Sequence, residues 1–218
     1  ALGVDTATHW ILGVGAGSAN GAAVVLLAPD ADRPRATTRL IDGRSGGRLT
    51  LAHFPVPDDA VVATGDAALA LLTELEAIAA IGACAEALGA ADAGLALTVD
   101  YLKQRTQFGT PLASFQAVQH QMAESFCDIE QMRSLVLWGA IALDATPAER
   151  IRAAAALKTV TGRQGVRAVS RCIQVSGGIG VTQDYRIGHV YKRLLTCAAL
   201  FGATESHIAR LGSLSAAG

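Results

Sequence analysis

Hydrophobic positions are grouped differently in the two parts of the chain. In the first 65 residues they form short runs, HWILGVG, GAAVVLLAP and GRLTLAHFPVP, separated by Gly, Ser, Asn, Asp and Pro. Such β-rich runs predict strands joined by turns, with AGSANG as a hairpin turn between the first two. Three strands make a poor sheet alone, because its edges stay unpaired. We expect residues 1–65 to be a partial β-domain, completed by residues absent from this chain or by a partner.

From residue 66 onward the apolar positions recur every three to four residues, which is typical of helices. Four such positions, Leu71, Leu75, Ile78 and Ile81, begin a helix that is predicted to end near Arg105. Further helices are predicted at 114–143, 146–175 and 204–214, and an apolar helical pattern is interrupted at Gly202 and Ala203. Long helices with short connections predict an antiparallel four-helix bundle over residues 66–218, so the fold class is α+β.

Helix caps are predicted from single residues. Ser114 and Thr204 are candidate N-caps, and the segment TPAE, which starts at Thr146, has the spacing of a capping box. Glu205 would then lie near the positive end of the last helix dipole. The group Thr204 to His207 brings an acid, two hydroxyls and an imidazole together, but we interpret it as a helix start.

Composition narrows the class of protein. Of 218 residues 51% are hydrophobic and 17% are charged, which argues against disorder. A net charge of -1 gives no field that would attract nucleic acid or an anionic membrane.

The uncharged stretch 6–29 is interpreted as two strands around a turn and not as a membrane span. The sequence has four widely spaced cysteines, Cys84, Cys127, Cys172 and Cys197. We expect them to be reduced thiols that are buried as small hydrophobic side chains in a cytoplasmic protein. The opening ALGVDTATHW has no basic leader, so we expect no signal peptide. It also lacks an initiator methionine, so we expect that residues are missing upstream.

Two glycine-containing segments are candidates for ligand binding. In YLKQRTQFGTPLASFQ, Arg105 could neutralise a helix C-terminus while Phe108 packs back onto the last turn. Alternatively, Arg105 binds a phosphate and Phe108 offers a flat apolar surface, as in a cofactor clamp. The glycines of QVSGGIG could end a helix, or let a phosphate approach backbone N–H groups. This segment lacks the GxGxxG spacing, which excludes a Rossmann fingerprint.

Two polar rows have helical spacing. One row contains His120, Glu124 and Asp128, and the other contains Arg163, Arg167 and Arg171. The first could be metal ligands, but the ExxH pattern of di-iron sites is absent, so we interpret it as a solvated stripe and predict no metal. The arginine row is interpreted as a solvated or subunit-facing stripe, with contact to an acidic ligand as the alternative.

The motifs Arg105-x-Gln107-Phe108-Gly109, Phe115-Gln116 and Gln174-x-x-Gly177-Gly178-x-Gly180 occur together in a helical C-terminal half. This combination resembles the C-terminal domain of the acyl-CoA dehydrogenase family, flavoproteins that desaturate acyl-CoA thioesters. Upstream, RLIDGRSGGRLTLAHFPVPDDAVVATGDAA is similar to the last strands of that family's β-barrel-like middle domain. The family's N-terminal helical domain and the first half of its β-domain have no counterpart here, so they are either missing from this chain or lost.

The resemblance implies a cofactor, FAD, and residues that contact it. Arg105, Gln107 and Phe108 match the segment that reaches a neighbouring subunit's FAD at the pyrophosphate end. The loop that closes over the adenosine diphosphate of FAD, again across a subunit interface, is matched by Gln174, Gly177 and Gly178. Thr204 matches a threonine of the family and is expected to touch FAD. An acyl-CoA substrate and electron-transfer flavoprotein as electron acceptor are also implied.

The resemblance also implies that the catalytic base is absent. In most members a carboxylate removes the α-proton of the thioester, and its matched position here is Gly202; a register shift of one residue supplies no acid either. In a minority of members the base lies on the first helix, where the matched residue is Ala79 and the nearest acid is Glu76.

Taken together, the chain resembles the base-deficient subunit of heterotetrameric (α2β2) actinobacterial acyl-CoA dehydrogenases of steroid side-chain breakdown, in which the homologous partner supplies the base. Two alternatives stay open. One is a homomeric enzyme that uses Glu76 or Glu205 as the base, and the other is a catalytically silent relative that acts as a binding or structural subunit. The alanine-rich stretch AIAAIGACAEALGAADAG either leaves room for a bulky, sterol-like acyl group or serves close helix packing.

Overall fold

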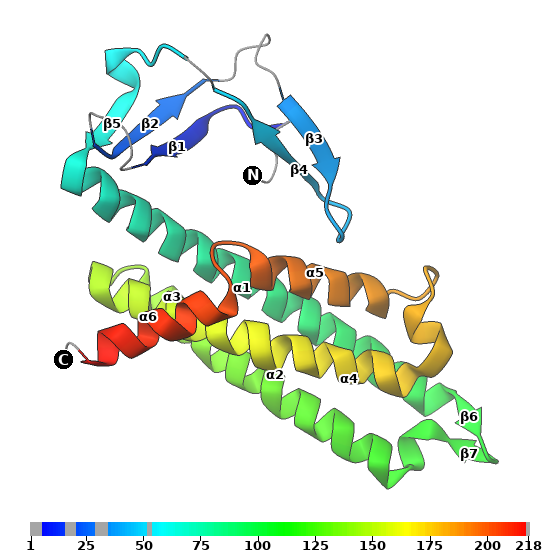
Figure 1. Cartoon of the computed structure of the whole chain (residues 1–218). Coiled ribbons are helices and arrows are strands. Elements are labelled where there is room, and N and C mark those ends of the chain that lie inside the picture. Colours follow the sequence, from blue (N-terminus) through cyan, green and yellow to red (C-terminus); the bar gives the residue numbers. More distant parts are fainter. Residues whose placement is uncertain (1–5, 16–20, 29–34, 52–53, 217–218) are drawn as a thin grey trace. The chain divides into compact units, whose positions relative to one another are not determined.

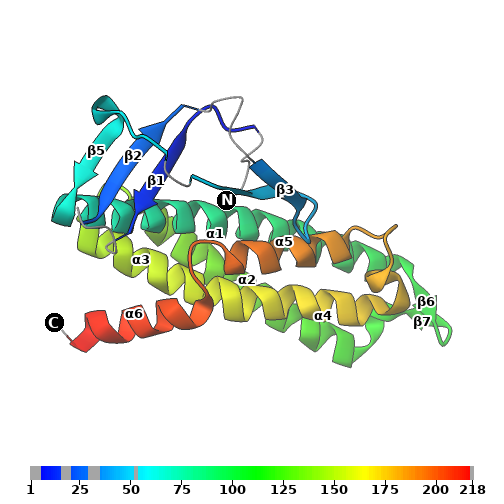
Figure 2. The ribbon, with the colours of Figure 1, turned by 45° about the horizontal axis from the view of Figure 1, so that its top comes forward.

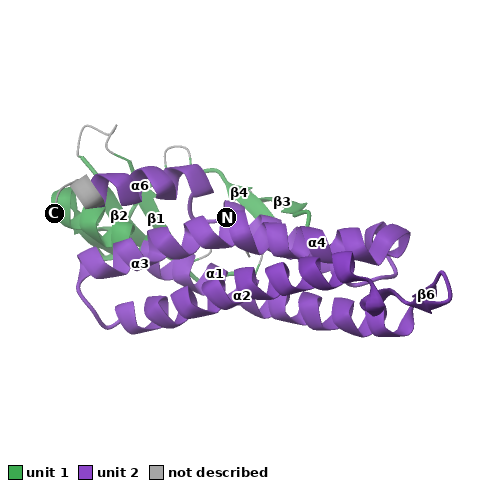
Figure 3. Cartoon of the chain, turned by 90° about the horizontal axis from the view of Figure 1, so that it is seen from below, with its two compact units in different colours: residues 1–76 green, residues 77–218 purple. Residues whose placement is uncertain are grey.

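The structure is a computed structural model, and it describes residues 6–15, 21–28, 35–51 and 54–216. The chain divides into two compact units, residues 1–76 and residues 77–218 (Figure 3). The change from strands to helices occurs at Gly65, where helix α1 begins, and the first turns of α1 belong to the first unit.

The first unit contains a three-stranded antiparallel sheet in the order β1-β2-β5. Its strands are β1 (Trp10–Val14), β2 (Ala23–Leu27) and β5 (Val61–Thr64). A separate antiparallel ribbon joins β3 (Arg35–Arg39) and β4 (Ser45–Leu49), and a short helix η1 (Asp58–Ala60) precedes β5. The predicted pairing of the first two strands is confirmed, while most of the AGSANG turn lies outside the described residues.

The sheet of the first unit is covered by the start of α1. Val24 of β2 and Ala68 of α1 are buried together, and Leu72 packs against them. The prediction lacked β3 and β5. Strand β3 has the sequence RATTR and carries no apolar run, whereas β5 is four residues long and leads directly into a helix, so neither has a strong strand signal.

The second unit is a bundle of long helices (Figure 1). It contains most of α1 (Gly65–Gln104), then α2 (Gln116–Ala142), α3 (Pro147–Val160), α4 (Val166–Ser176), α5 (Ile187–Ala199) and α6 (Thr204–Ala216). Between α1 and α2 lie the two-residue strands β6 (Thr106–Gln107) and β7 (Thr110–Pro111) and the turn η2 (Leu112–Ser114). A π-turn, η3 (Thr161–Gly165), joins α3 to α4, and a 3-10 turn, η4 (Gly177–Val181), follows α4.

The α+β class and the helical bundle are confirmed, with differences in detail. The helix predicted at 146–175 is interrupted by the π-turn into α3 and α4. The four predicted ranges omit α5, which corresponds to the apolar helical pattern that ends before Gly202. Helix α6 packs against α3, as Figure 2 shows.

Small residues dominate the core of the bundle. Ala87 and Ala91 of α1 are buried against Met132 of α2, Cys172 of α4 and Leu194 of α5. A second cluster joins α1 to α3 and contains Ala77, Ala80, Ile81, Cys84, Ala154 and Leu157. By length and composition alone α1 is apolar enough to cross a membrane, and we attribute this character to its place in these two clusters. Three cysteines are buried as predicted, but Cys127 is exposed, so its predicted burial is wrong.

The capping predictions had mixed outcomes. Thr146 and Glu149 form the predicted capping box, with the Thr146 hydroxyl 3.3 Å from the Glu149 amide. Ser114 is not an N-cap: its hydroxyl donates to the Pro111 carbonyl at 2.7 Å, and α2 begins at Gln116. Thr204 is the first residue of α6, and the first hydrogen bond of that helix runs from the His207 amide to the Ala203 carbonyl at 3.3 Å. Ala203 therefore stands at the N-cap position, and the prediction of Thr204 as the N-cap is also wrong.

Candidate cofactor-binding site

The two segments with candidate phosphate-binding residues line one groove at the end of the bundle where α1 and α4 terminate. The groove has a volume of about 500 Å³. Its walls are formed by Tyr101, Arg105, Gln107, Leu112, Val175, Ser176, Gly177, Gly178 and Ile179. Four of the predicted site residues, Arg105, Gln107, Gly177 and Gly178, are thus brought together although the two segments lie far apart in the sequence.

One wall is a tight hairpin that follows α1. The Arg105 amide donates to the Tyr101 carbonyl at 2.8 Å, and the Arg105 carbonyl accepts from the Leu112 amide at 2.8 Å. At the tip, Phe108 and Gly109 both have positive φ, 54° and 79°, which is the geometry of a two-residue type I′ turn. A positive φ is unusual for a phenylalanine, so the local structure holds this side chain in an unfavourable backbone conformation.

The Phe108 side chain is 93% exposed. The interpretation that it packs back onto the last turn of the preceding helix is therefore wrong. Its one aromatic contact among the described residues is with the ring of Phe115, edge to face, with centroids 6.2 Å apart. An aromatic ring presented in this way at a hairpin tip is available to a partner outside this chain.

The opposite wall is the turn that ends α4. Gly177 caps this helix with φ 67°, and its amide donates to the Gln174 carbonyl. No atom lies within 4 Å of the position that a Cβ of Gly178 would occupy, so a ligand can approach the backbone closely there. At Gly180, in contrast, a Cβ would stand 2.8 Å from the Ile173 carbonyl oxygen, so that glycine serves packing.

The chemistry of the groove favours an anion. The exposed Arg105 guanidinium can donate two parallel hydrogen bonds to a phosphate, and no carboxylate is among the lining residues that the structure describes. Tyr185, whose ring lies 5.5 Å from that of Tyr101, donates to the Leu97 carbonyl at 3.2 Å. Burial raises the pKa of Tyr185, which lies next to Tyr101 and does not itself line the groove. These residues fit a phosphate-bearing cofactor such as FAD.

The other predicted site residues do not line this groove. Gln174 is exposed on α4, Thr204 lies against Gly162 of the π-turn, and Glu205 is exposed in the first turn of α6. On α1, Glu76 is exposed at the end of the first unit, and Ala79 is half-buried in the second unit.

Gly202, the residue matched to the family's base, has a left-handed backbone with φ 97°. A Cβ at Gly202 would stand 2.8 Å from Nε2 of His207, which also lies 2.8 Å from the Phe201 carbonyl oxygen. This position therefore disfavours any side chain, and a glutamate above all.

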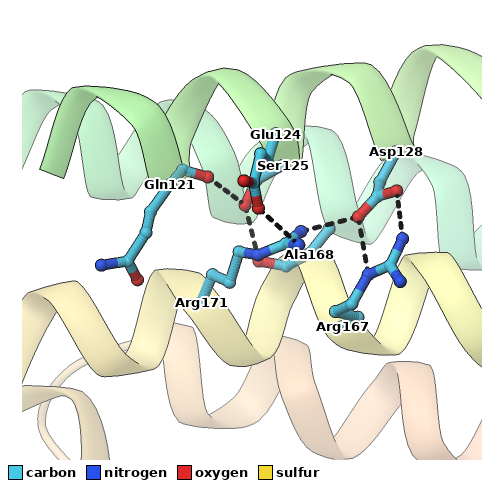
Figure 4. A network of polar contacts seen from close by, with 7 residues as sticks. All are labelled: Gln121, Glu124, Ser125, Asp128, Arg167, Ala168 and Arg171. Atoms are coloured by element: carbon cyan, nitrogen blue, oxygen red, sulfur yellow. Dashed lines mark hydrogen bonds and ion pairs between the residues drawn. The ribbon is translucent and has the colours of Figure 1, made fainter. Parts of the chain in front are cut away.

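The acidic row of α2 and the arginine row of α4 meet in one network (Figure 4). Asp128, 5% exposed, accepts from Arg167 through Nη2 at 2.7 Å and Nε at 3.2 Å, and from Nη1 of Arg171 at 2.7 Å. Arg171 also pairs with Glu124 at 2.7 Å. The interpretation as a solvated stripe is thus wrong for Asp128, which is buried, whereas Arg167 remains 54% exposed while it pairs with that carboxylate.

Burial works to raise the pKa of Asp128, but the hydrogen bonds and charges of Arg167 and Arg171 together lower it below 3.8. The carboxylate is therefore ionised in the folded chain and serves as a link between α2 and α4. Neither row forms a metal site: the described residues contain no group of three His, Cys, Asp or Glu side chains that could hold an ion.

Comparison with known proteins decides the family. Residues 70–213 match the family described as "Acyl-CoA dehydrogenase, C-terminal domain". This chain belongs to the acyl-CoA dehydrogenase family. The resemblance derived from the motifs is confirmed, and members of this family use FAD.

The relatives include acyl-CoA dehydrogenases, and one solved structure is named as a steroid enzyme. The acyl-CoA dehydrogenase IpdE2 of Mycolicibacterium smegmatis is 36% identical over 135 residues, which are 61% of this chain and 41% of that protein. Among solved structures, the Tcur3481-Tcur3483 steroid ACAD is 31% identical with a TM-score of 0.82, and the match covers 99% of this chain and 57% of that one. The ChsE4-ChsE5 complex of Mycobacterium tuberculosis, 24% identical, shares the fold with a TM-score of 0.85 over 97% of this chain and 57% of that one. The chain thus spans about two fifths of the length of IpdE2.

Proposed function

We propose that this chain is a subunit of a FAD-dependent acyl-CoA dehydrogenase and that its groove holds the phosphate end of a FAD bound mainly by a neighbouring, homologous subunit. The observation that carries this proposal is the groove itself, which unites Arg105 and Gln107 with Gly177 and Gly178. Arg105 would bind the pyrophosphate through its guanidinium, and the open Cα of Gly178 would let that group approach the backbone. Phe108, almost fully exposed, would pack on the neighbouring subunit beside the cofactor.

FAD, when bound, accepts the hydride that leaves the β-carbon of the acyl-CoA thioester. Removal of the α-proton needs a carboxylate on the opposite face of the substrate. We infer that the homologous partner supplies this carboxylate, in an α2β2 assembly, because Gly202 and Ala79 occupy the two positions where the family places it. The backbone of Gly202 and its closeness to His207 support this inference, since a Cβ there would take a strained left-handed conformation and stand 2.8 Å from Nε2 of His207. A steroid-type acyl-CoA as substrate, electron-transfer flavoprotein as electron acceptor and a cytoplasmic location complete the proposal.

The first test is composition and activity. We expect the chain, co-produced with a homologous acyl-CoA dehydrogenase subunit, to purify as a yellow complex with about one flavin for each pair of subunits. The chain alone should not oxidise an acyl-CoA with an artificial electron acceptor. Turnover by the chain alone would refute the missing base, and Glu76→Gln and Glu205→Gln would then identify which of the two exposed acids is used.

The second test addresses the groove. Arg105→Gln should weaken FAD retention by the complex by roughly 10- to 100-fold, because a charge-assisted hydrogen bond contributes about 1.5–3 kcal/mol. Lys103→Gln is the matched control, since Lys103 is exposed on the last turn of α1, carries the same charge and does not line the groove. Flavin content after dialysis, measured by absorbance, distinguishes the two variants. Equal retention by both would show that the groove is not the phosphate site.

A further inference from the structure

A buried ammonium group closes the C-terminus of α5. Lys158 of α3 is fully buried, and its Nζ donates to the carbonyls of Cys197 at 2.9 Å, Ala198 at 2.7 Å and Leu200. An ammonium has three N–H donors, so these three bonds satisfy it completely. The last carbonyls of a helix lack partners within the helix and lie at the negative end of its dipole. Lys158 therefore supplies both the donors and the charge that this helix end needs.

Among the residues that the structure describes, no carboxylate pairs with Lys158. The titratable groups that face it are the thiols of Cys84 and Cys197, and burial raises the pKa of Cys84 to about 11, so that thiol stays neutral. Burial also lowers the pKa of Lys158, whereas the three accepting carbonyls favour its charged form. A fully buried lysine that makes no ion pair with a described carboxylate is rare in proteins, which points to a specific role for this one.

One turn after Lys158, the π-turn that follows α3 contacts the first residue of α6. The π-turn Thr161–Gly165 places Gly162 against Thr204, and a Cβ at Gly162 would overlap the Thr204 hydroxyl. Lys158 and Gly162, four residues apart, thus contact the two ends of the connection between α5 and α6. Within that connection Phe201 and Gly202 both have positive φ, 56° and 97°, and for Phe201 this is a conformation that a residue with a side chain rarely adopts.

We propose that Lys158 is a positioning residue that, together with Gly162, holds residues 200–204 in the conformation that the cofactor site requires. This inference rests on the proposed function, because residues 200–204 contain Gly202, at the family's base position, and Thr204, matched to a threonine that touches FAD. The cation fixes the Leu200 end through its carbonyl bonds, and the side-chain-free Gly162 admits Thr204 at the other end.

Hydrogen exchange of the isolated chain tests the structural part. Lys158→Met removes the cation at similar length, and it should speed exchange in residues 197–207 on the order of tenfold or more, while the core amides of α1 and α2 keep their wild-type rates. Leu157→Ala is the matched control, since Leu157 is the adjacent, equally buried residue of α3 but packs toward α1. It should lower the melting temperature without a selective effect on residues 197–207. The same exchange pattern in both variants would refute the positioning role.

A second variant keeps the test decisive if Lys158→Met does not fold. Gly162→Ala leaves the cation in place but pushes on Thr204, so exchange should rise in residues 203–207. In Gly162→Ala combined with Thr204→Ala, the overlapping hydroxyl is gone, and the exchange effect should be smaller than the sum of the single effects. Strictly additive effects would overturn the proposed contact.

The functional part uses the complex with its homologous partner. At a temperature where all variants are folded, Lys158→Met should shift the visible flavin absorption bands and lower kcat on the order of tenfold, whereas Leu157→Ala should change neither. A wild-type flavin spectrum and kcat in Lys158→Met would refute the role in the cofactor site. If the wild-type complex contains no flavin, the proposed function fails, but the exchange experiment still decides whether Lys158 holds residues 200–204.

Discussion

Asp128 is expected to be the most stabilising polar residue between α2 and α4, and Asp128→Asn tests this. The carboxylate is nearly buried and accepts three charge-assisted hydrogen bonds from two arginines. Removal of one partner from a buried ion pair typically costs about 3–5 kcal/mol, and a hydrogen bond to a charged group contributes about 1.5–3 kcal/mol. Because the Arg167 side chain is 54% exposed, water screens part of its interaction. We therefore expect Asp128→Asn to lower the free energy of unfolding by roughly 2–3 kcal/mol at pH 7.

The stabilisation by Asp128 is expected to depend on pH in one direction. The pKa of Asp128 is lower in the folded chain than its ordinary value of 3.8, so the folded state binds the proton less tightly than the unfolded state does. The stabilisation is then fully present above about pH 4 and is lost as the pH falls through the folded-state pKa. The difference between wild type and Asp128→Asn should stay constant from pH 5 to pH 8 and shrink at lower pH.

Urea unfolding followed by circular dichroism measures this difference. Glu124→Gln is the control, because Glu124 is 62% exposed and pairs with the same Arg171; we expect it to cost about 0–1 kcal/mol. High salt should reduce the Glu124 effect more than the Asp128 effect. An Asp128→Asn effect no larger than that of Glu124→Gln, or one that grows on acidification, would refute the assignment of a buried, ionised carboxylate.

Three further predictions concern single residues. Thr146→Ala removes the capping box of α3 and should lower the free energy of unfolding by about 1 kcal/mol in thermal melts; no change would mean that the helix end is held by other contacts. Gly202→Glu restores a carboxylate at the family's base position, yet it should destabilise the chain by roughly 1–3 kcal/mol and confer no turnover on the chain alone, because of the left-handed backbone and His207. With a thiol reagent at pH 8, mass spectrometry should find Cys127 modified at once and Cys84 only after unfolding, since burial raises the pKa of Cys84 to about 11; equal rates would contradict its burial.

The helices could be predicted from the sequence because their signals are local. Apolar spacing predicted the long helices to within a few residues, and the four-residue segment TPAE was enough to predict the capping box at Thr146. The errors arose where a local contact competes with a helix cap. Ser114 has a favoured N-cap side chain, but its hydroxyl is taken up by the Pro111 carbonyl within a 3-10 turn. The π-turn was not predicted, and its Gly162 lies against Thr204, a contact between distant segments that the local pattern does not contain.

The candidate site was predictable in residue type but not in arrangement. The motifs named Arg105 and Gly178, yet only the packing of the helices shows that they line one groove. The same limit applies to the polar rows: four-residue spacing places Asp128 on a helix face and Arg167 on another, but it does not say that the two faces meet. The resulting error was to interpret the buried Asp128 carboxylate as part of a solvated stripe.

The groove and the position matched to the catalytic base lie in different parts of the chain, so one can change without the other. The groove of Arg105 and Gly178 lies at the end of α4, whereas Gly202 lies in the connection between α5 and α6. Under the proposed function, a glycine at position 202 therefore leaves the groups of the groove unchanged. The connection itself contains a phenylalanine at positive φ, Phe201, and it contacts the buried charge of Lys158, and each of these features is unfavourable on its own. Departures from local preference of this kind persist where a site depends on them. The groove and this connection, with glycine at the position matched to the family's base, are the features that the proposed division of the site between two homologous subunits requires.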